Sequence, residues 1–320
     1  MRLWRTNCAE NKMKKYKVCI ECKTYNQENV ISRALDGLVM QKTNFPFIAI
    51  VIDDASTDHT PEIVKNYESK YPDKIKAICL KENRWQKGLS HRPVWLEFEY
   101  ETEYVTYCDG DDYWIDENKI QREVDLLDAH PEYSMVCSSR FVKDPEGKMY
   151  EDVFHGELFK TADFLEGVYL HSQVMLHRSN PDFILRMFKK YDMDYEKMGG
   201  FNEMMMGYFY SLLGDVATLP NIVAVYVMDG GGVWSKYSEN EKRYYELIDL
   251  YDNHKLLKFE YRDIFAKAFF KKSWDNVWYP VKHHNADKTT WKIFVNMFKC
   301  LSLKEFSVEM GHWLKKKLKR

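Results

Sequence analysis

The sequence predicts an α/β fold, in which a sheet is flanked by helices and followed by a helical C-terminal appendage. The segment Phe47–Ile52 (FIAIVI) is continuously apolar, which is typical of a strand covered on both faces. Strand-like and helix-like periods alternate up to Ser139, an order that favours a largely parallel sheet with helices on both sides. From Ser238 onward, charged and aromatic segments with helical spacing replace the strand signals. The chain has 320 residues, 45% of them hydrophobic, which is enough for one large domain and an appendage.

The individual elements follow from local signals. Apolar residues at helical spacing predict a helix over Asn29–Gln41, and Pro61 marks another that begins at Thr60. We expect Asp116 to cap the helix after the fourth strand. The predicted strands are Tyr16–Asn26, Phe47–Ile52, Ile75–Leu80, Tyr104–Cys108, His171–Arg178 and Asn221–Met228, and the other predicted helices are Ser90–Tyr100 and Asn202–Leu213.

These elements divide the chain into a polar leader (1–14), an α/β domain (15–235) and a helical region (236–320). In residues 291–320, one helical face carries Phe306, Met310, Trp313, Leu314 and Leu318. Five of the last six residues are Lys or Arg. Such a helix either lies on an anionic membrane surface or packs on the main domain with a solvated basic end. The sequence leaves both alternatives open.

Composition and missing signals limit the functional classes. The net charge of −2 gives no overall field that would attract nucleic acid. The sequence has no apolar run long enough to span a membrane and no signal-peptide core, so we expect a cytoplasmic protein. Cys19 and Cys22 form a C-x-x-C, but residues three apart on a strand point to opposite faces, which favours core packing. His171 and His177 lack the spacing of metal ligands. Nothing in the sequence indicates the oligomeric state.

Acidic side chains follow two of the predicted strands. Asp53 and Asp54 come at the end of the second strand, and Asp109, Asp111 and Asp112 come directly after the fourth. The carboxyl ends of parallel strands share one rim of the sheet, and ligands bind there. Clustered carboxylates repel one another, and a Mg²⁺ or Mn²⁺ ion removes this repulsion while it binds the phosphates of a substrate.

The ligand that fits this rim is a nucleoside diphosphate. The two best-known phosphate-cradling loops, G-x-G-x-x-G and G-x-x-x-x-G-K-[ST], are absent, so a cation has to carry the phosphate charge. Asp53 and Asp54 could accept hydrogen bonds from a base or a ribose. The alternative is an acidic loop with a structural role. For Ser56 and Asp58 we favour that alternative, as caps of the helix at Thr60.

Three segments carry a resemblance to a known family. TYNQE (24–28), DDASTD (53–58) and CDGDDYW (108–114) have the order and spacing found in the inverting glycosyltransferases of family 2, which have the GT-A fold. The similarity covers roughly residues 16–235. It implies a bacterial enzyme of surface polysaccharide synthesis. Such an enzyme moves a sugar from a nucleotide-diphosphate donor to a saccharide or a lipid-linked saccharide. UDP is the nucleotide that we favour here.

The resemblance also implies roles for individual residues. Asp109 and Asp111 match the D-x-D pair that holds Mn²⁺ or Mg²⁺, with Asp111 as the direct ligand. Glu203 matches the general base. The residues that match the nucleotide-sugar site are Thr24, Tyr25 and Glu28 in the first motif, Asp54 with Asp53 in the second, and Asp109 in the third.

The chain departs from the family pattern at two positions. Lys23 stands where a proline usually precedes T-Y-N. Asp229 stands where a histidine is common before G-G-V-W-S, so a phosphate contact from that turn is in doubt. Arg84 and Lys87 are candidates for a positive contact to the diphosphate, against the alternative that both are simply solvated.

The implied reaction is a single displacement with inversion. Glu203 would take the proton of the acceptor hydroxyl, whose pKa lies far above 7, while the oxygen attacks the anomeric carbon. A cation at Asp111 would neutralise the leaving diphosphate. One alternative is a sugar-phosphate nucleotidyltransferase, which usually carries a glycine-rich N-terminal loop. The other is a catalytically silent scaffold on the membrane. A lipid-linked acceptor would suit a protein held peripherally on the inner face of the plasma membrane.

Overall fold

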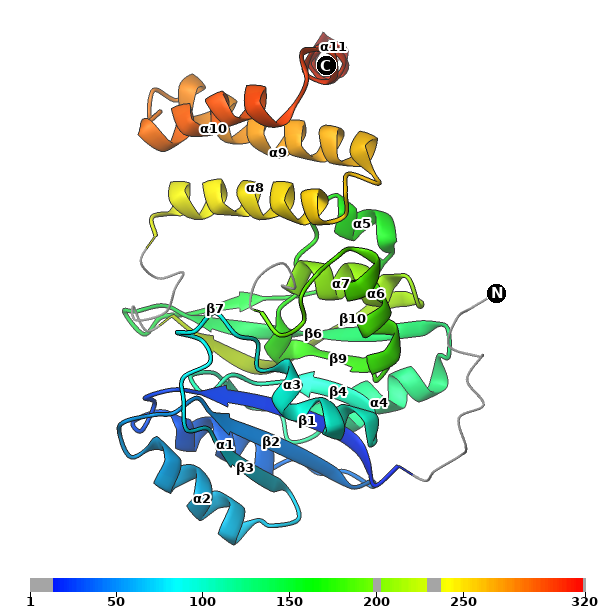
Figure 1. The fold of residues 1–320 in the computed structure, drawn as a ribbon. Helices are drawn as coiled ribbons and strands as arrows, with labels where there is room; N and C mark the ends of the chain where they lie inside the picture. The colour runs from blue at the N-terminus through cyan, green and yellow to red at the C-terminus, as the bar shows by residue number, and fades with distance from the viewer. Residues whose placement is uncertain (1–13, 198–202, 229–236, 319–320) are drawn as a thin grey trace. The chain divides into compact units, whose positions relative to one another are not determined.

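The computed structural model describes residues 14–197, 203–228 and 237–318 (Figure 1). These residues fold into two compact units. The first comprises Met1–Thr161 and Tyr169–Asp229, and the second comprises Ala162–Val168 and Gly230–Arg320. The predicted leader except for Lys14, and the predicted boundary between residues 235 and 236, lie outside the described residues.

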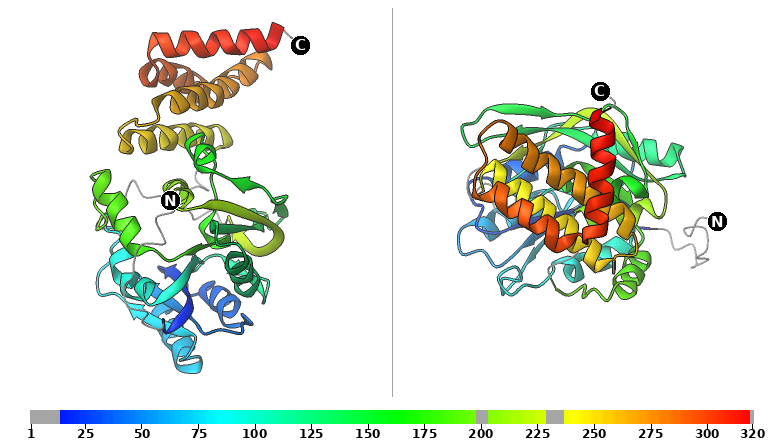
Figure 2. Two further views of the ribbon diagram at one scale, coloured as in Figure 1. Left: turned by 90° about the vertical axis from the view of Figure 1, so that its right-hand side faces the viewer. Right: turned by 90° about the horizontal axis from the view of Figure 1, so that it is seen from above.

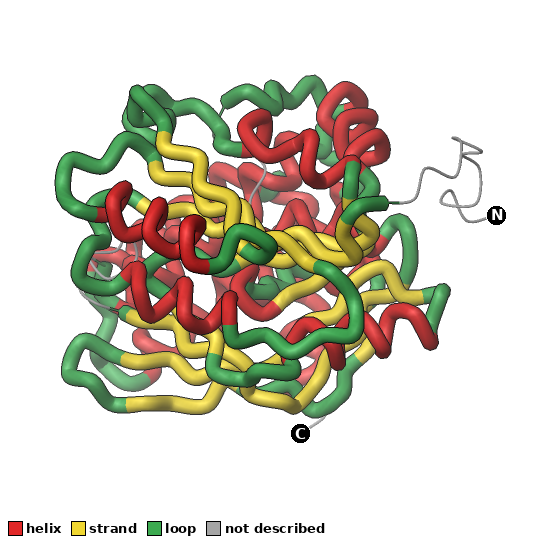
Figure 3. The backbone as a smooth tube through the Cα atoms, turned by 90° about the horizontal axis from the view of Figure 1, so that it is seen from below, coloured by secondary structure: helices red, strands yellow, loops and turns green. Residues whose placement is uncertain are grey.

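One mixed sheet runs through the first unit (Figure 3). Its strands follow the order β3, β2, β1, β4, β9, β6, β10, β5, with β7 beside β6 and β8 beside β10. The bounds are Tyr16–Thr24 (β1), Phe47–Asp53 (β2), Ile75–Cys79 (β3), Thr102–Tyr107 (β4), Tyr113–Trp114 (β5), Tyr133–Lys143 (β6), Met149–Asp152 (β7), Leu158–Phe159 (β8), Met175–Arg178 (β9) and Asp215–Val227 (β10).

Strand direction changes within this sheet. β1 to β4 are parallel to one another, and so are β6 and β10. β9 lies between the two groups and is antiparallel to both of its neighbours, β4 and β6. The predicted α/β class is confirmed. The prediction of a largely parallel sheet is correct for β1–β4 and wrong for the sheet as a whole.

Helices flank the sheet of the first unit, and their sequence spacing explains their burial. α1 packs beside α2, and α3 packs beside α6. Every residue of β2 is buried, as its continuous apolar run predicts. The apolar positions that predicted α1 and that it buries are Ile31, Ala34, Leu35 and Leu38. The bounds are Ile31–Val39 (α1), Thr60–Lys70 (α2), Arg92–Tyr100 (α3), Lys119–Ala129 (α4), Pro181–Lys190 (α6) and Glu203–Ser211 (α7).

Several local predictions need correction. The segment His171–Arg178 is not one strand, because Ser172–Val174 forms a 3₁₀ turn (η2) and β9 begins only at Met175. β6 has no counterpart among the predicted strands. Its buried stretch contains Ser138, Ser139 and Arg140, and these polar residues interrupt the hydrophobic pattern that signals a strand.

Helix starts also differ from expectation. α4 begins after Asn118, and Asp116 is not its cap. The Asp116 carboxylate instead accepts a hydrogen bond from the Asn118 N–H (2.9 Å) and pairs with Arg122 (2.6 Å), so it closes a turn before the helix. At α2 the N-cap is His59, so Asp58 is not the cap that we expected; its Oδ1 accepts from the Thr60 N–H at 3.0 Å and closes the turn before the helix. Ser56 does not cap α2, because its hydroxyl accepts from the Asn26 N–H.

The second unit is helical, which confirms the predicted helical C-terminal region. It contains α8 (Glu239–Leu256), α9 (Arg262–Lys282), α10 (Lys288–Cys300) and α11 (Leu303–Leu318), and most of α5 (Thr161–Leu165). Within this unit α11 lies across α9 and α10 (Figure 2). Capping boxes begin α8 at Ser238 and α10 at Asp287. No described helix is both long and apolar enough to cross a bilayer.

The apolar face predicted on α11 is divided between packing and exposure. Phe306 lies against Phe270 of α9, with ring centroids 5.6 Å apart, and Trp313 lies against Trp274 at 5.8 Å. Leu314 and Leu318 remain 47% and 86% exposed. Part of this face is therefore used to hold α11 on α9, and its C-terminal part is open.

Candidate active site

Backbone hydrogen bonds bring the three sequence motifs to one rim of the sheet. Thr24 ends β1 and pairs in register with Asp53 at the end of β2. The Asp54 N–H donates to the Thr24 carbonyl at 2.9 Å, and the Gly110 N–H donates to the Lys23 carbonyl at 2.8 Å. The ends of β1, β2 and β4 are thus joined directly. The prediction that both acidic clusters share one rim is confirmed.

Gly110 lets the acidic loop approach β1 closely. A Cβ atom on this residue would lie 2.4 Å from Gln27 Oε1 and 2.9 Å from both Ile31 Cδ1 and Thr24 Cβ. Every non-glycine residue would therefore force the loop away from the strand end. The tight D-G-D sequence fixes the position of the carboxylates on either side of it.

Asp109 faces a cation supplied by the chain itself. Lys23 Nζ lies 3.5 Å from Asp109 Oδ1, and the two side chains are 40% and 42% exposed. The pKa of Lys23 is raised, first by Asp109 and then by Glu21 and Glu203, so the ammonium is held in its charged form.

Asp111 and Asp112 have different surroundings. Asp112 is buried, and its two oxygens accept from the Val227 N–H (2.9 Å) and from Gln173 Nε2 (3.2 Å). Burial, and next the neighbouring charge of Asp111, raise the pKa of Asp112 well above its usual range. Asp112 is therefore a structural tie between the acidic loop and β10. Asp111 is less buried, and its main-chain carbonyl accepts from Arg33 Nη2 at 3.3 Å.

The donor set at this loop fits a hard divalent cation. Asp109 and Asp111 offer carboxylate oxygens, the ligands that Mg²⁺ and Mn²⁺ prefer. Within the described residues, no cluster of three or more His, Cys, Asp or Glu side chains could hold a metal ion. A cation here would thus complete its shell with substrate phosphates and water, as Mg²⁺ commonly does. Lys23 already neutralises part of the charge on Asp109.

The two carboxylates after β2 have separate tasks. Both oxygens of Asp54 are occupied, because Oδ1 accepts from the Arg84 N–H (2.7 Å) and Oδ2 from the Trp85 N–H (3.0 Å). His91 Nε2 also lies 3.1 Å from Oδ1. Asp53 accepts from the Ser56 N–H through Oδ2, whereas its Oδ1 is buried with no hydrogen-bond partner. Burial raises the pKa of Asp53. Asp54 therefore holds the loop at Arg84 and Trp85 in place, and Asp53 has one buried oxygen that accepts no hydrogen bond.

The first motif is tied to the second by side chains. The Thr24 hydroxyl donates to Gln27 Oε1 at 2.7 Å, and Glu28 Oε2 accepts from the His59 N–H at 2.9 Å. Thr24 is buried, so it shapes the turn from inside. Tyr25 is 38% exposed, and its hydroxyl lies 3.4 Å from Gln86 Nε2. Of these predicted residues, Tyr25 is the one with a ring open to a ligand.

The two cations proposed for the diphosphate already have partners. Arg84 donates through Nε to the Ser90 carbonyl at 2.7 Å, and its Nη2 lies 3.4 Å from Glu196. Lys87 pairs with Glu82 at 2.6 Å. Arg84 thus has ordered partners in the protein, whereas the pair of Lys87 with Glu82 is exposed to solvent, with the two side chains 50% and 71% exposed, which agrees with a solvated Lys87. Arg84 and Lys87 stand in the same loop that Asp54 anchors.

Glu203 is the first residue of α7 and is held by the turn before β9. Its Oε1 accepts from the Ser172 N–H at 2.7 Å, and its Oε2 lies 3.9 Å from His171 Nδ1. The side chain is 24% exposed. Burial, and next Arg140, lower the pKa of His171 to about 3, so this ring is neutral at pH 7. Oε1 of Glu203 is therefore anchored, and Oε2 accepts no hydrogen bond from the part of the chain that the structure describes.

Two other predictions about Cys and His side chains can be read from the structure. Cys19 and Cys22 are both fully buried in β1, which agrees with core packing. His177 is also fully buried, and its Nε2 lies 2.8 Å from the Tyr107 hydroxyl. Burial lowers the pKa of His177 to about 3, so it is a neutral core residue. Asp229 lies outside the described residues.

Comparisons with known proteins agree with this geometry. The sequence model described as Glycosyl transferase family 2 matches residues 22–214. An uncharacterized protein of Mycobacterium tuberculosis is 28% identical over 236 residues, which is 70% of this chain and 62% of that protein. The chain thus spans less than two thirds of the length of this curated relative.

Solved structures share the fold. A crystal structure of residues 1–349 of Staphylococcus aureus TarS in complex with UDP-GlcNAc aligns with a TM-score of 0.55 at 19% identity, covering 81% of this chain and 73% of that chain. The mannosyltransferase PcManGT from Pyrobaculum calidifontis, in complex with GDP-Man and Mn²⁺, aligns with a TM-score of 0.53 at 16% identity and covers 93% and 80%. The fold is GT-A, and the chain belongs to the glycosyltransferases of family 2.

Proposed function

We propose that this glycosyltransferase moves a sugar from a nucleotide-diphosphate donor, with UDP as the favoured nucleotide, to the hydroxyl of a saccharide or lipid-linked saccharide. The observation that carries the proposal is the junction of β1, β2 and β4, where Gly110 and Asp54 donate to the end of β1. It gathers the D-x-D pair and Asp53, a carboxylate with one unsatisfied oxygen, at one rim of the sheet. The role in surface polysaccharide synthesis belongs to the same proposal.

The donor nucleotide is proposed to bind over the ends of β1 and β2. The buried Oδ1 of Asp53 lacks a partner, and a buried acceptor without a partner costs roughly 1–3 kcal/mol. An N–H of a base or a ribose hydroxyl would satisfy it if donor binding moves the surrounding loop, because this oxygen is closed to solvent. Tyr25 offers its exposed ring beside this position, and Thr24 and Glu28 shape the turn. Asp54, Arg84 and Lys87 would act through the loop that they hold.

The diphosphate is proposed to lie at the acidic loop. Mn²⁺ or Mg²⁺ bound by Asp111, with Asp109 beside it, would supply positive charge for the leaving diphosphate. The mannosyltransferase neighbour is described as a complex with Mn²⁺, which supports this choice of cation. Lys23 adds a fixed positive charge 3.5 Å from Asp109.

Glu203 is proposed to be the general base. Its anchored Oε1 fixes the orientation of the carboxylate, and Oε2 would accept the proton of the acceptor hydroxyl. The acceptor oxygen then forms the bond to the anomeric carbon as the bond to the diphosphate oxygen breaks on the opposite face. One displacement of this kind inverts the anomeric configuration. His171 is neutral at pH 7, so it does not form an ion pair that would make the Glu203 carboxylate a weaker base.

We further propose that the protein works peripherally on the inner face of the plasma membrane, through residues 291–320. Leu314 and Leu318 on α11 are exposed, and α11 ends in a turn with Lys315, Lys316 and Lys317. Apolar side chains next to basic residues favour a helix on an anionic surface. Such a location would bring the enzyme to a lipid-linked acceptor.

A panel of nucleotide-sugars tests the central proposal. The melting temperature of the full chain would be measured with UDP-GlcNAc, UDP-glucose and GDP-mannose, each with Mn²⁺ and with EDTA. We expect one donor to stabilise the fold in Mn²⁺ and to be hydrolysed slowly, because a ligand that binds only the folded state stabilises it. EDTA and Asp111→Ala should each abolish the effect. If no donor binds or reacts, the transferase proposal is wrong. If EDTA changes nothing, only the metal is removed from it.

A further inference from the structure

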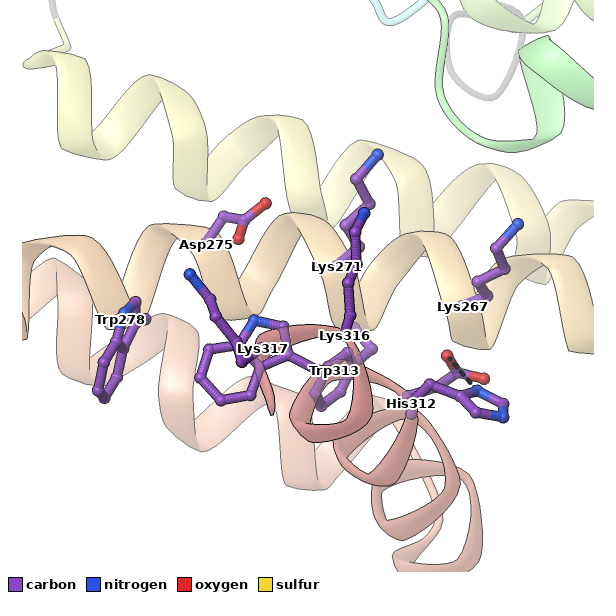
Figure 4. Close-up of a pocket in the computed structure, with 10 residues that line it drawn as sticks. Lys267, Lys271, Asp275, Trp278, His312, Trp313, Lys316 and Lys317 are labelled. Atoms are coloured by element: carbon purple, nitrogen blue, oxygen red, sulfur yellow. Dashed lines mark ion pairs between the residues drawn. The ribbon is translucent and has the colours of Figure 1, made fainter. Parts of the chain in front are cut away.

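The second unit contains a hollow of about 340 Å³ between α9 and α11 (Figure 4). α9 contributes Lys271 and Trp278 to its wall, and α11 contributes Trp313, Lys316 and Lys317. The three residues from α11 are spaced by three and four positions, so they form one stripe of that helix. The hollow is thus built by two helices whose facing stripes combine indole rings with ammonium groups.

Positive charge is in excess at this hollow. Lys267, at one end, pairs with Glu166 at 3.2 Å, and His312 lies 3.5 Å from Glu309. By contrast, Lys271, Lys316 and Lys317 take part in no ion pair among the described residues. Asp275 is the remaining acidic residue of the wall. Three exposed ammonium groups without a counter-ion repel one another, and an anion placed between them would relieve that repulsion.

The aromatic side of the hollow is packed and preorganised. The Trp313 ring lies edge-on to Trp274 (5.8 Å between centroids) and to Trp278 (5.6 Å). Lys317 Nζ lies 5.7 Å from the centroid of the Trp313 ring, within the range of a cation–π contact. Trp278 is 41% exposed. Indole rings with one wet edge are characteristic of the interface between a membrane and water.

The surroundings of the hollow identify its occupant. Exposed apolar side chains also occur on both helices that build the hollow, since Tyr279 on α9 is 60% exposed and Leu314 and Leu318 on α11 are 47% and 86% exposed. A soluble polyanion would need the lysines but would leave these side chains in water. A membrane lipid uses both, because its headgroup is charged and its neighbours are apolar.

We propose that this hollow is a binding site for the phosphate headgroup of an anionic membrane lipid. The headgroup phosphate lies between Lys271, Lys316 and Lys317, with Trp278 and Trp313 at the depth of the lipid glycerol. This inference rests on the peripheral membrane contact proposed above and deepens it. It assigns the contact to a defined site that includes α9, rather than to a diffuse basic tail.

Vesicle sedimentation with two matched triple variants tests the site. The full chain is mixed with vesicles of phosphatidylglycerol and phosphatidylcholine, or of phosphatidylcholine alone. The first variant replaces Lys271, Lys316 and Lys317 by Gln. The control replaces three other exposed lysines of the same unit, Lys282, Lys288 and Lys299, by Gln, which removes the same charge. Thermal melting and donor hydrolysis of each variant confirm that the fold and the transferase site are unchanged.

We expect wild-type chain to bind the anionic vesicles and not the neutral ones. Each lysine at an anionic surface contributes roughly fivefold, so the first variant should bind about 100-fold more weakly and the control within about threefold of wild type. Equal losses in both variants would overturn the site and leave a diffuse contact. If wild type ignores anionic vesicles, the membrane contact itself is wrong and the site falls with it. Binding of soluble polyphosphate but not of vesicles, lost only in the first variant, would reassign the hollow to a soluble polyanion. None of these results touches the transferase proposal, which the donor panel tests.

Discussion

Replacing Lys23 by Met should increase the affinity of the acidic loop for Mn²⁺. Lys23 Nζ lies 3.5 Å from Asp109 Oδ1 and is charged, since its pKa is raised by Asp109, Glu21 and Glu203. The ammonium therefore competes with a metal ion for the first carboxylate of the D-x-D pair. Met retains the unbranched stem of Lys, and the backbone bond from Gly110 to the Lys23 carbonyl needs no side chain.

The size of the effect follows from the geometry. A pair of unit charges at this distance is worth about 1 kcal/mol in a water-like dielectric. Both side chains are close to half exposed, at 40% and 42%, so the lower dielectric of a protein core does not apply. Measured exposed pairs contribute roughly 0.2–1 kcal/mol. Releasing the carboxylate should thus tighten Mn²⁺ binding by up to about fivefold.

Electron paramagnetic resonance of free Mn²⁺, titrated with protein in the absence of nucleotide, measures this affinity directly. Leaving out the nucleotide matters because Lys23 would also attract a diphosphate, which would work in the opposite direction. Lys42→Met is the matched control, since Lys42 makes an exposed pair with Glu117 at 2.7 Å. Unchanged or weaker Mn²⁺ binding in Lys23→Met, with Lys42→Met equal to wild type, would refute the competition between Lys23 and the cation.

Three further predictions follow from single contacts. Glu203→Gln should keep donor affinity within a few-fold and lower the single-turnover rate by roughly 10²–10⁴, the usual contribution of a positioned base; near-normal turnover would move the base elsewhere. Gly110→Ala should lower the free energy of unfolding in urea by about 1–3 kcal/mol and weaken donor binding, because the new Cβ would lie 2.4 Å from Gln27 Oε1. Gly311→Ala is the control and should be neutral or stabilising, because a Cβ there enters open space on α11. Lys119→Met should cost roughly 3–5 kcal/mol, because the fully buried Glu123 loses its cationic partner at 2.7 Å and keeps only the hydrogen bond from Ser138. Burial already raises the pKa of Glu123, so its charged form opposes folding. The loss of stability in Lys119→Met should therefore shrink as the pH falls from 8 towards 5. A loss that does not change with pH would contradict the role of Lys119 as the charge partner of Glu123.

Much of the first unit could be predicted because its signals are local. The continuous apolar run of β2 and the spacing of apolar residues in α1 each report burial directly, and both elements are where the sequence places them. β6 could not be found in this way. Its buried polar residues are compensated by long-range contacts, such as the Ser138 hydroxyl donating to Glu123 at 2.6 Å. Compensation of this kind depends on a partner that lies on another element, and no local pattern contains it.

The roles of the site residues show the same limit. Lys23 can be recognised in the sequence as a departure from the family pattern, yet its pairing with Asp109 depends on β1 and β4 lying side by side. The anchoring of Glu203 by the Ser172 N–H requires the 3₁₀ turn that precedes β9. That turn falls within a segment whose sequence favours a strand. Contacts between distant segments, rather than residue types, decide these assignments.

The five carboxylates of the two acidic clusters differ in burial and in hydrogen bonding, and the sequence alone does not reveal these differences. Asp54 and Asp112 are buried, and both oxygens of each already accept a hydrogen bond from a group of the protein. Asp109 is 42% exposed, and Asp111 is less buried than Asp112. Asp53 is buried but keeps Oδ1 without a partner. A hydrogen-bond donor at Asp53 Oδ1 and a cation beside the more accessible carboxylates would each lower the free energy of this rim. The nucleotide-sugar and cation proposed above would supply both, because the base or ribose would donate a hydrogen bond and the cation would neutralise negative charge. A ligand that lacks a hydrogen-bond donor at one end or phosphates at the other would satisfy fewer of these carboxylate oxygens.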